Sequence, residues 1–135
     1  MSQENVEVMS RMYEAWLRGD PALFDALDPE IELHPDPEAH WVGVNRTYRG
    51  HEGMREYMGA VYEAFEDYRP EVEKFLDVED KVVTLAVEHG RGRGSTAEVQ
   101  SNRTAHVWTL RNGKAVRLDL YMNRKQALEA VGLRE

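Results

Sequence analysis

The side chains of this sequence that could bind an anion or move a proton are mainly histidines and arginines. His89 and Arg91 are two residues apart in a strand-like segment, so both side chains would lie on one face of a strand. A guanidinium group binds carboxylates through paired hydrogen bonds, so Arg91 could anchor an acidic substrate with His89 beside it. The alternative is a strand end in water, with both side chains solvated.

The histidines do not form a metal-binding pattern. The chain has 5 of them, but their spacing matches no ligand motif, and no cysteine is present as a ligand or a nucleophile. We therefore expect a protein without a metal or another cofactor.

Residues 98–122 predict a β-hairpin, and its register decides which side chains face inward. Asn112 and Gly113 both tolerate positive φ, which makes them the strongest short signal for a hairpin turn. With Arg111 opposite Lys114, one face is mostly apolar and carries Ala105, Val107, Thr109, Val116, Leu118 and Leu120. The other face carries Thr104, His106, Trp108, Arg117, Asp119 and Tyr121. We expect the apolar face to point inward, because burial of apolar surface drives folding.

In this register His106 lies opposite Asp119, which resembles an acid–base dyad. The pair would lie on the outer face, however, where a solvated cross-strand pair or a dimer contact is the more natural interpretation. Trp108, Arg117 and Tyr121 share that face, and these residue types are enriched at protein interfaces. We therefore predict a homodimer through the outer sheet face, and no inward carboxylate on this hairpin.

Hydrophobic periodicity and turn residues predict the remaining elements. These are helices at about 5–18 and 51–65, a short helix after Asp20-Pro21, strands at 31–34, 71–78 and 81–93, and a last helix after Asn123. Helices followed by a strongly curved antiparallel or mixed sheet indicate the α+β class, with one domain over residues 1–135.

Composition excludes several classes of partner. The chain has 135 residues and a formal net charge of −8, which argues against nucleic acids and anionic membrane surfaces. No apolar run is long enough for a transmembrane helix, and the N-terminus has no signal-peptide pattern. We therefore expect a cytoplasmic protein with neither a nucleic-acid nor a membrane partner.

Four segments carry a resemblance to a known family: residues 13–20, 48–53, 106–114 and 121–133. They read YEAWLRGD, YRGHEG, HVWTLRNGK and YMNRKQALEAVGL. In these segments the chain resembles the SnoaL-like branch of the nuclear transport factor 2-like superfamily, which includes polyketide cyclases and ketosteroid isomerases. The resemblance implies a cone, in which a strongly curved sheet wraps around three helices of the N-terminal half and encloses a cavity.

The resemblance also implies positions for catalytic groups. In ketosteroid isomerases the general base is an Asp immediately before a Pro at the end of the first strand, and His34-Pro35 is the matching pair here. A neutral imidazole accepts a proton at neutral pH, so His34 is the expected base; the alternative is a rim residue held by the loop backbone. A donor near the end of the first helix corresponds to Met12 or Tyr13, of which Tyr13 can donate. The second acidic donor falls at Ala105, so the resemblance does not support steroid-type isomerisation.

Aromatic and polar residues around the expected cavity form the predicted ligand-binding set. Trp41 and Tyr48 bracket part of a long loop over 35–47, and loops of this length often form sites. The predicted ligand-binding residues are Trp16, Trp41, Tyr48, Met58, His89, Arg91 and Leu120.

The sequence thus predicts a protein that binds a small hydrophobic molecule in the cone cavity. As an enzyme, it would perform cofactor-free acid–base chemistry of the isomerase, cyclase or dehydratase type on a carbonyl compound. His34 would be the base, Tyr13 or Tyr48 the donor, and Arg91 the anchor. The alternatives are a non-catalytic ligand-binding protein and a protein-interaction module.

Overall fold

The computed structural model describes residues 2–36, 46–92 and 100–133, so the prediction for Trp41 lies outside the described residues. The elements in chain order are α1 (Ser2–Arg18), η1 (Pro21–Ala26), β1 (Leu27–His34), β2 (Tyr48–Arg49), α2 (Gly50–Ala64), β3 (Phe65–Val78), β4 (Lys81–Gly92), β5 (Gln100–Arg111), β6 (Lys114–Tyr121) and α3 (Arg124–Ala130). The described strands form one sheet of 6 in the order β2-β1-β6-β5-β4-β3, in which β1 and β6 pair in parallel. The predicted α+β class with a mixed sheet is confirmed. Among the described residues, no helix has the length and apolar character needed to cross a membrane.

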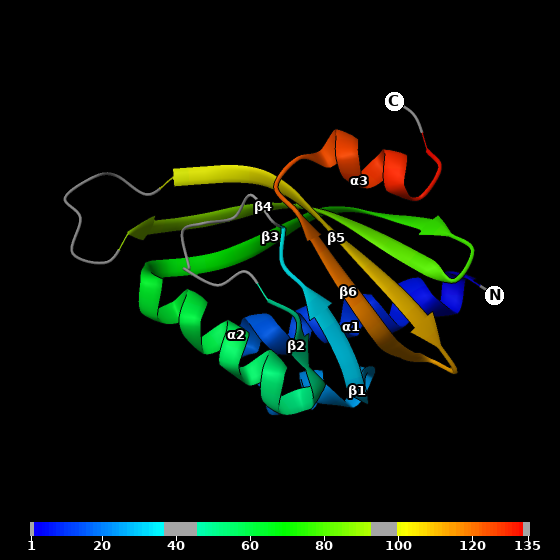
Figure 1. Ribbon diagram of the computed structural model, residues 1–135, viewed down its shortest axis with the longest axis horizontal. Coiled ribbons are helices and arrows are strands. Elements are labelled where there is room, and N and C mark those ends of the chain that lie inside the picture. Colours follow the sequence, from blue (N-terminus) through cyan, green and yellow to red (C-terminus); the bar gives the residue numbers. More distant parts are fainter. Residues whose placement is uncertain (1, 37–45, 93–99, 134–135) are drawn as a thin grey trace.

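The sheet curves around the helices of the N-terminal half, as the predicted cone requires (Figure 1). Its inner face is covered by α1 and α2, where Met9, Ile31 and Trp108 belong to the main apolar core. Its outer face is partly covered by α3, where Val107 and Ala127 belong to a smaller core. The two cores therefore lie on opposite sides of the central strands.

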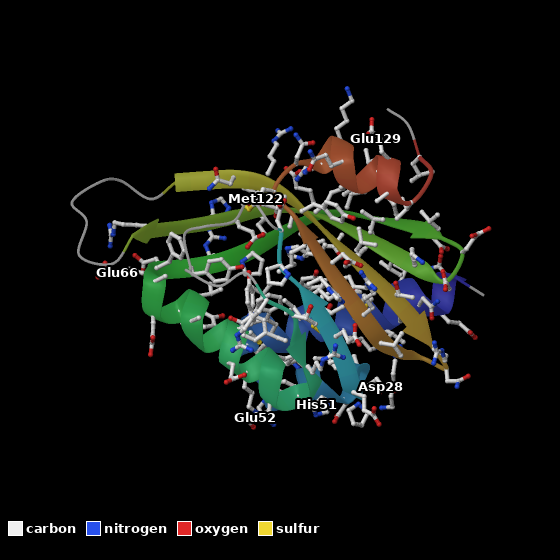
Figure 2. The ribbon with its side chains drawn as sticks, in the orientation of Figure 1. Asp28, His51, Glu52, Glu66, Met122 and Glu129 are labelled. Carbon is white, nitrogen blue, oxygen red and sulfur yellow. The ribbon has the colours of Figure 1, made fainter. Side chains whose placement is uncertain are left out.

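Acidic side chains of the helices point to solvent. Glu52 on α2 and Glu129 on α3 are both exposed and point away from the sheet (Figure 2). Charges placed there are fully hydrated and leave the cores apolar.

Local sequence signals account for several turns and helix ends. The Asp20 side chain accepts a hydrogen bond of 2.9 Å from a first-turn amide and caps η1. Asn123 caps α3 in the same way, at 3.1 Å. Asn112 and Gly113 have φ of +54° and +76°, as a two-residue hairpin turn requires. These predictions are confirmed.

Two strands begin earlier than predicted, β1 at Leu27 and β3 at Phe65. Both residues are extended C-cap residues, whose amides bond back to the end of η1 and of α2. The chain therefore passes from helix to strand without a loop, and periodicity alone does not show such a direct transition.

A bulge in β6 overturns the predicted register of the last hairpin. The pairs beside the turn are as expected, but Thr109 then pairs with Arg117 instead of Val116. Val116 is left as the extra residue of a β-bulge. Beyond it Trp108 pairs with Leu118, so the shift by one residue exchanges the faces of β5 relative to β6.

As a result, the predicted faces are right for β6 beyond the bulge and wrong for β5, and before the bulge Ala115 lies in the inner core against the prediction. Leu118 belongs to the inner core, as expected. Trp108 and His106 also face inward and are 1% and 2% exposed. Ala105 and Val107 belong instead to the outer core, under α3. The prediction that Trp108 contributes to a dimer contact on the outer face is wrong for this reason.

Gly53 marks the closest approach of α2 to β2. An added Cβ there would lie 3.0 Å from the Tyr48 carbonyl carbon and 3.2 Å from the Tyr48 Cβ. We therefore expect Gly53→Ala to lower the free energy of unfolding by about 1 to 3 kcal/mol, because the helix must shift. On the same helix, a Cβ at Gly59 meets nothing within 4 Å. Gly59→Ala should therefore raise this free energy by about 0.5 to 1 kcal/mol. Urea unfolding measures both, and equal effects would contradict the close approach.

Candidate ligand-binding and acid–base site

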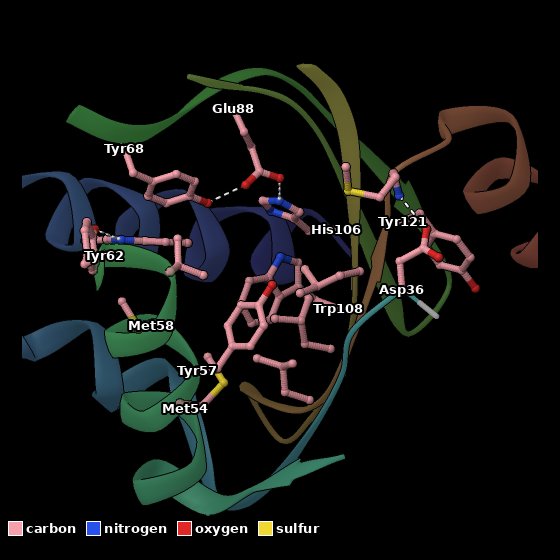
Figure 3. A pocket seen from close by; sticks show the side chains of 16 residues that line it. Asp36, Met54, Tyr57, Met58, Tyr62, Tyr68, Glu88, His106, Trp108 and Tyr121 are labelled. Carbon is pink, nitrogen blue, oxygen red and sulfur yellow. Dashed lines mark hydrogen bonds and ion pairs between the residues drawn. The ribbon is translucent and has the colours of Figure 1, made fainter. Parts of the chain in front are cut away.

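A pocket lies between α2 and the inner face of the sheet (Figure 3). Its empty space is about 650 Å³ when the solvent at its mouth is counted, and about 40 Å³ of it admits the centre of a water-sized molecule. Its described lining consists of Trp16, Leu33, Asp36, Met54, Tyr57, Met58, Val61, Tyr62, Tyr68, Glu88, His106, Trp108, Leu118, Leu120, Tyr121 and Met122. The walls are thus mainly apolar and aromatic, with a few acidic and basic groups among them.

Tyr68 and His106 of this pocket both contact Glu88 of β4 (Figure 3). The Glu88 carboxylate accepts a hydrogen bond from the Tyr68 hydroxyl on β3 and one of 2.6 Å from the Thr104 hydroxyl. His106 Nε2 lies 3.1 Å from the same carboxylate. Thr104 pairs with Ala86 across β4 and β5, and alternation then places Glu88 and His106 on the same inner face.

A chain of hydrogen bonds continues from His106 into the core. The Tyr13 hydroxyl is 2.6 Å from His106 Nδ1, and Trp108 Nε1 donates to the Tyr13 oxygen at 2.9 Å. Because an indole N–H can only donate, the Tyr13 hydrogen is free to point to His106 Nδ1. His106 then carries its own hydrogen on Nε2 and donates it to Glu88. In this arrangement every polar hydrogen of the chain points to an acceptor.

Electrostatics keep Glu88 ionised. Burial alone would raise the pKa of this carboxyl, but the hydrogen bond and charge of His106 lower it, and the other two donors bring the pKa to about 2. Burial and the nearby Glu88 charge raise the pKa of Tyr57 and of Tyr68 above the usual value of a phenol. At neutral pH the site therefore holds a carboxylate among neutral phenols. In the described part of the chain, no group of three or more histidine and acidic side chains could hold a metal ion.

Tyr57 supplies a hydroxyl that is open to the pocket. Its ring projects from α2 into the pocket (Figure 3). It meets the ring of Tyr48 edge to face, with centroids 5.4 Å apart. Among the described residues, the Tyr57 hydroxyl has no hydrogen-bond partner. A neutral donor near an ionised carboxylate is the combination that proton abstraction beside a carbonyl requires, because one group takes the proton and the other stabilises the oxygen.

The structure brings three predicted ligand-binding residues to the pocket wall, namely Trp16, Met58 and Leu120. Their contact with a ligand stays a prediction. Tyr48 is 2% exposed and packs behind Tyr57, so it supports the wall rather than forming it.

The two predicted catalytic residues lie apart. Tyr13 is 2% exposed and sits behind His106, to which it is bonded. His34 lies on the outer face of β1, because its neighbour Leu33 is in the inner core and side chains alternate along a strand. There His34 Nε2 is 3.0 Å from Glu32 Oε1. His34 is therefore not among the described residues that line the main pocket, and its role as a base stays a prediction.

His89 and Arg91 also lie away from the main pocket. His89 Nε2 is 2.8 Å from Glu71 Oε1. His89 borders a second pocket, which shares Tyr68, Glu88 and Met122 with the main pocket. Arg91 forms ion pairs of 3.2 Å with Glu66 and 3.1 Å with Asp67. Glutamate and aspartate side chains of β3 thus bind both His89 and Arg91. Arg91, the expected anchor for a substrate carboxylate, is therefore not at the site.

The central residue of the site, Glu88, was not predicted from the sequence. The inner face of β4 carries Val82, Thr84, Ala86 and then Glu88. An acidic residue that continues an alternating row of buried residues in a strand is a signal for a buried carboxyl group, and the sequence contains this signal. It is ambiguous here, because the opposite face of β4 also reads as apolar and the sequence does not show which face is inner.

Comparisons with known proteins agree on the fold. A family model described as the SnoaL-like domain matches residues 9–118. An NTF2-like protein of unknown function from Burkholderia pseudomallei is 21% identical, with 98% of this chain and 99% of that chain covered and a TM-score of 0.79. A proposed SnoaL-like polyketide cyclase from a Jannaschia species is 16% identical, with 100% and 96% covered and a TM-score of 0.73.

A third structure was solved with a small molecule. It is a hypothetical protein with a ketosteroid isomerase-like fold from Catenulispora acidiphila, in complex with trimethylamine. It is 19% identical, with 94% of this chain and 93% of that chain covered and a TM-score of 0.71. The search of curated proteins finds no match. At these identities the likenesses show the fold and leave the activity open.

Proposed function

This chain belongs to the SnoaL-like family, and from that premise we propose that it binds a small, largely apolar molecule in the pocket under α2 and acts on it by cofactor-free acid–base chemistry. The substrate class is a carbonyl compound with an acidic C–H beside the carbonyl. The observation that carries the proposal is the ionised Glu88 in the wall of an otherwise largely apolar and aromatic pocket.

Glu88 is the proposed base. Its low pKa keeps the carboxylate deprotonated at neutral pH but makes it a weak base before the substrate binds. A substrate that displaces the Tyr68 hydroxyl removes one of the interactions that lower this pKa, so the carboxylate becomes more basic in the complex. His106 is a positioning residue, because it holds the carboxylate and is itself held by Tyr13.

Tyr57 is the proposed donor to the substrate oxygen. When the base removes the C–H proton, negative charge develops on the carbonyl oxygen, and a neutral hydroxyl stabilises it. Burial keeps the Tyr57 phenol protonated, so the hydrogen is available across the neutral pH range.

Two similar structures support a small-molecule site in this fold. The Catenulispora acidiphila protein was solved in complex with trimethylamine, and the Jannaschia protein is a proposed polyketide cyclase. Both observations belong to those proteins and suggest the same kind of site here.

A non-catalytic ligand-binding protein is the second candidate function. Both ring nitrogens of His106 have protein partners, and Glu88 already accepts from neighbouring groups. Such a satisfied network is also what a rigid binding site requires. In this case the pocket would bind its ligand tightly without turnover.

The homodimer predicted from the sequence stays a proposal. Arg117 and Tyr121 belong to the outer face, and the Arg117 side chain is half exposed. Trp108 is not available there, so an interface on this face would depend on the remaining residues.

Exchange of C–H hydrogen for deuterium tests the proposed base without knowledge of the natural substrate. We use 2-tetralone, a flat and mainly apolar ketone, in D₂O, and follow loss of the signal of the hydrogens beside the carbonyl by NMR. The protein should accelerate this exchange, and Glu88→Gln should slow the catalysed part by at least about 100-fold, as expected for loss of a general base.

Glu71→Gln is the matched control, since Glu71 is exposed on β3 and outside the main pocket. It should exchange at the rate of the wild type. His34→Ala tests the assignment made from the sequence, and an unchanged rate removes His34 from the mechanism. Catalysed exchange that survives Glu88→Gln would refute Glu88 as the base. A pocket that binds 2-tetralone without catalysing exchange would favour the second candidate function.

A further inference from the structure

The described wall of the pocket carries acidic groups and no fixed positive charge. Asp36 and Glu88 are its carboxyl side chains, and neither lysine nor arginine is among the described residues that line it. Asp36 is 5% exposed and accepts a hydrogen bond of 2.7 Å from the Met122 amide. A carboxylate or phosphate ligand would therefore meet charge of its own sign, which disfavours binding in a poorly hydrated pocket.

Three groups bond to the ionised carboxylate of Glu88. They are the hydroxyls of Tyr68 and Thr104 and Nε2 of His106. A carboxylate has about four acceptor positions, so room for a further contact remains. His106 is the one basic side chain among the described residues of this lining, against the two carboxyl groups of Asp36 and Glu88, so the wall favours a ligand of positive charge.

Aromatic rings extend the pocket wall away from Glu88. Trp16 Nε1 donates to the Tyr62 hydroxyl at 2.9 Å, and the rings of Tyr62 and Tyr68 meet edge to face with centroids 5.6 Å apart. Tyr68 in turn donates to Glu88, and Tyr57 projects into the same pocket (Figure 3). Aromatic rings attract cations through their electron-rich faces, most strongly where water is excluded.

We propose that the ligand of this pocket carries a positively charged nitrogen, as a tertiary or quaternary alkylamine does, and that this nitrogen lies against Glu88 among the rings of Tyr57, Tyr62 and Tyr68. The inference rests on the proposed function, because it takes the same pocket as the ligand site. An alkylammonium group suits both parts of the wall: its carbon atoms contact the rings, and its charge compensates the carboxylate. A neutral group of the same shape gains only the contact of its carbon atoms with the rings.

Three ligands of nearly equal shape separate the effect of charge from that of shape. Choline is the cation, 3,3-dimethylbutan-1-ol its neutral counterpart, and 3,3-dimethylbutanoate the anion. By isothermal titration calorimetry, choline should bind the wild type at least about tenfold more tightly than the alcohol, and the anion should bind most weakly. In Glu88→Gln, choline should fall to the affinity of the alcohol, while the alcohol keeps its own affinity.

Tyr62→Leu provides a second variant that keeps the carboxylate. The Tyr62 side chain is 41% exposed, so its replacement leaves the core packed. It should lower the affinity of choline several-fold more than the affinity of the alcohol, because the alcohol loses only the contact of its carbon atoms with the ring. Equal affinities of choline and the alcohol for the wild type would overturn the proposal, as would a preference that survives Glu88→Gln or an absence of binding by all three ligands. The 2-tetralone assay judges the proposed function separately, because its substrate carries no charge.

Discussion

The His106→Ala variant is expected to lose about 3 to 5 kcal/mol of unfolding free energy at pH 7. The substitution removes a donor to Glu88 and the acceptor of the Tyr13 hydroxyl in one step. Both groups are buried or nearly so, and a buried charge that loses a partner costs more than an average hydrogen bond. Urea unfolding followed by circular dichroism measures the loss.

The pH dependence identifies Glu88 as the source of this loss. The pKa of Glu88 in the folded protein is about 2, which is below the usual pKa of a glutamate. The ionised carboxylate therefore stabilises the fold when the pH is above that usual pKa. That contribution fades as the pH falls from about 5 toward 2. In His106→Ala the main interaction that lowers this pKa is gone, while burial still raises it. The difference between wild type and variant should therefore shrink as the pH falls from about 5 toward 2.

His89→Ala is the matched control for this prediction. His89 also faces a glutamate on a neighbouring strand, but Glu71 is exposed. Its loss should cost less than about 1 kcal/mol, as is usual for exposed pairs. An effect of His106→Ala no larger than that of His89→Ala would show that the buried network does not stabilise the fold.

Much of the fold could be predicted because local chemistry determines it. Asp20 and Asn123 cap helices whatever surrounds them, and Asn112-Gly113 forms its turn because both residues adopt positive φ. Apolar periodicity identified α1 and α2, and the family resemblance supplied the cone. None of these signals depends on contacts between distant segments.

The candidate site was harder to predict because it depends on strand register. One extra residue in β6, Val116, determines whether His106 and Trp108 face α1 and α2 on the inner side of the sheet or α3 on its outer side. Both faces of β5 carry residues that can be buried, so the sequence pattern does not select one. The same ambiguity on β4 hid Glu88. Register is fixed by packing against α1, α2 and α3, which are remote in sequence.

The correction also reverses the expected sign of charge at the site. Arg91 was expected to bind an acidic substrate, but acids of β3 hold it elsewhere. The pocket contains Glu88 instead, whose three hydrogen-bonding neighbours all donate to it. The proposed class of ligand thus depends on strand parity, because the parity of β4 determines whether a carboxylate or a guanidinium lines the pocket.

Trp108→Ala tests this parity directly and is expected to cost about 3 to 5 kcal/mol of unfolding free energy. Trp108 is 1% exposed, so truncation leaves a large cavity in the inner core and removes the donor to the Tyr13 oxygen. Trp108→Phe keeps most of the ring volume and loses only the donor, so about 1 to 2 kcal/mol is expected for it. Arg117→Ala, on the outer face and half exposed, should cost less than about 1 kcal/mol. Urea unfolding and sedimentation velocity on all three variants distinguish the alternatives. If Trp108 lay at an outer dimer contact, Trp108→Ala would change the sedimentation coefficient and leave the unfolding of the monomer almost unchanged, which would contradict the register described above.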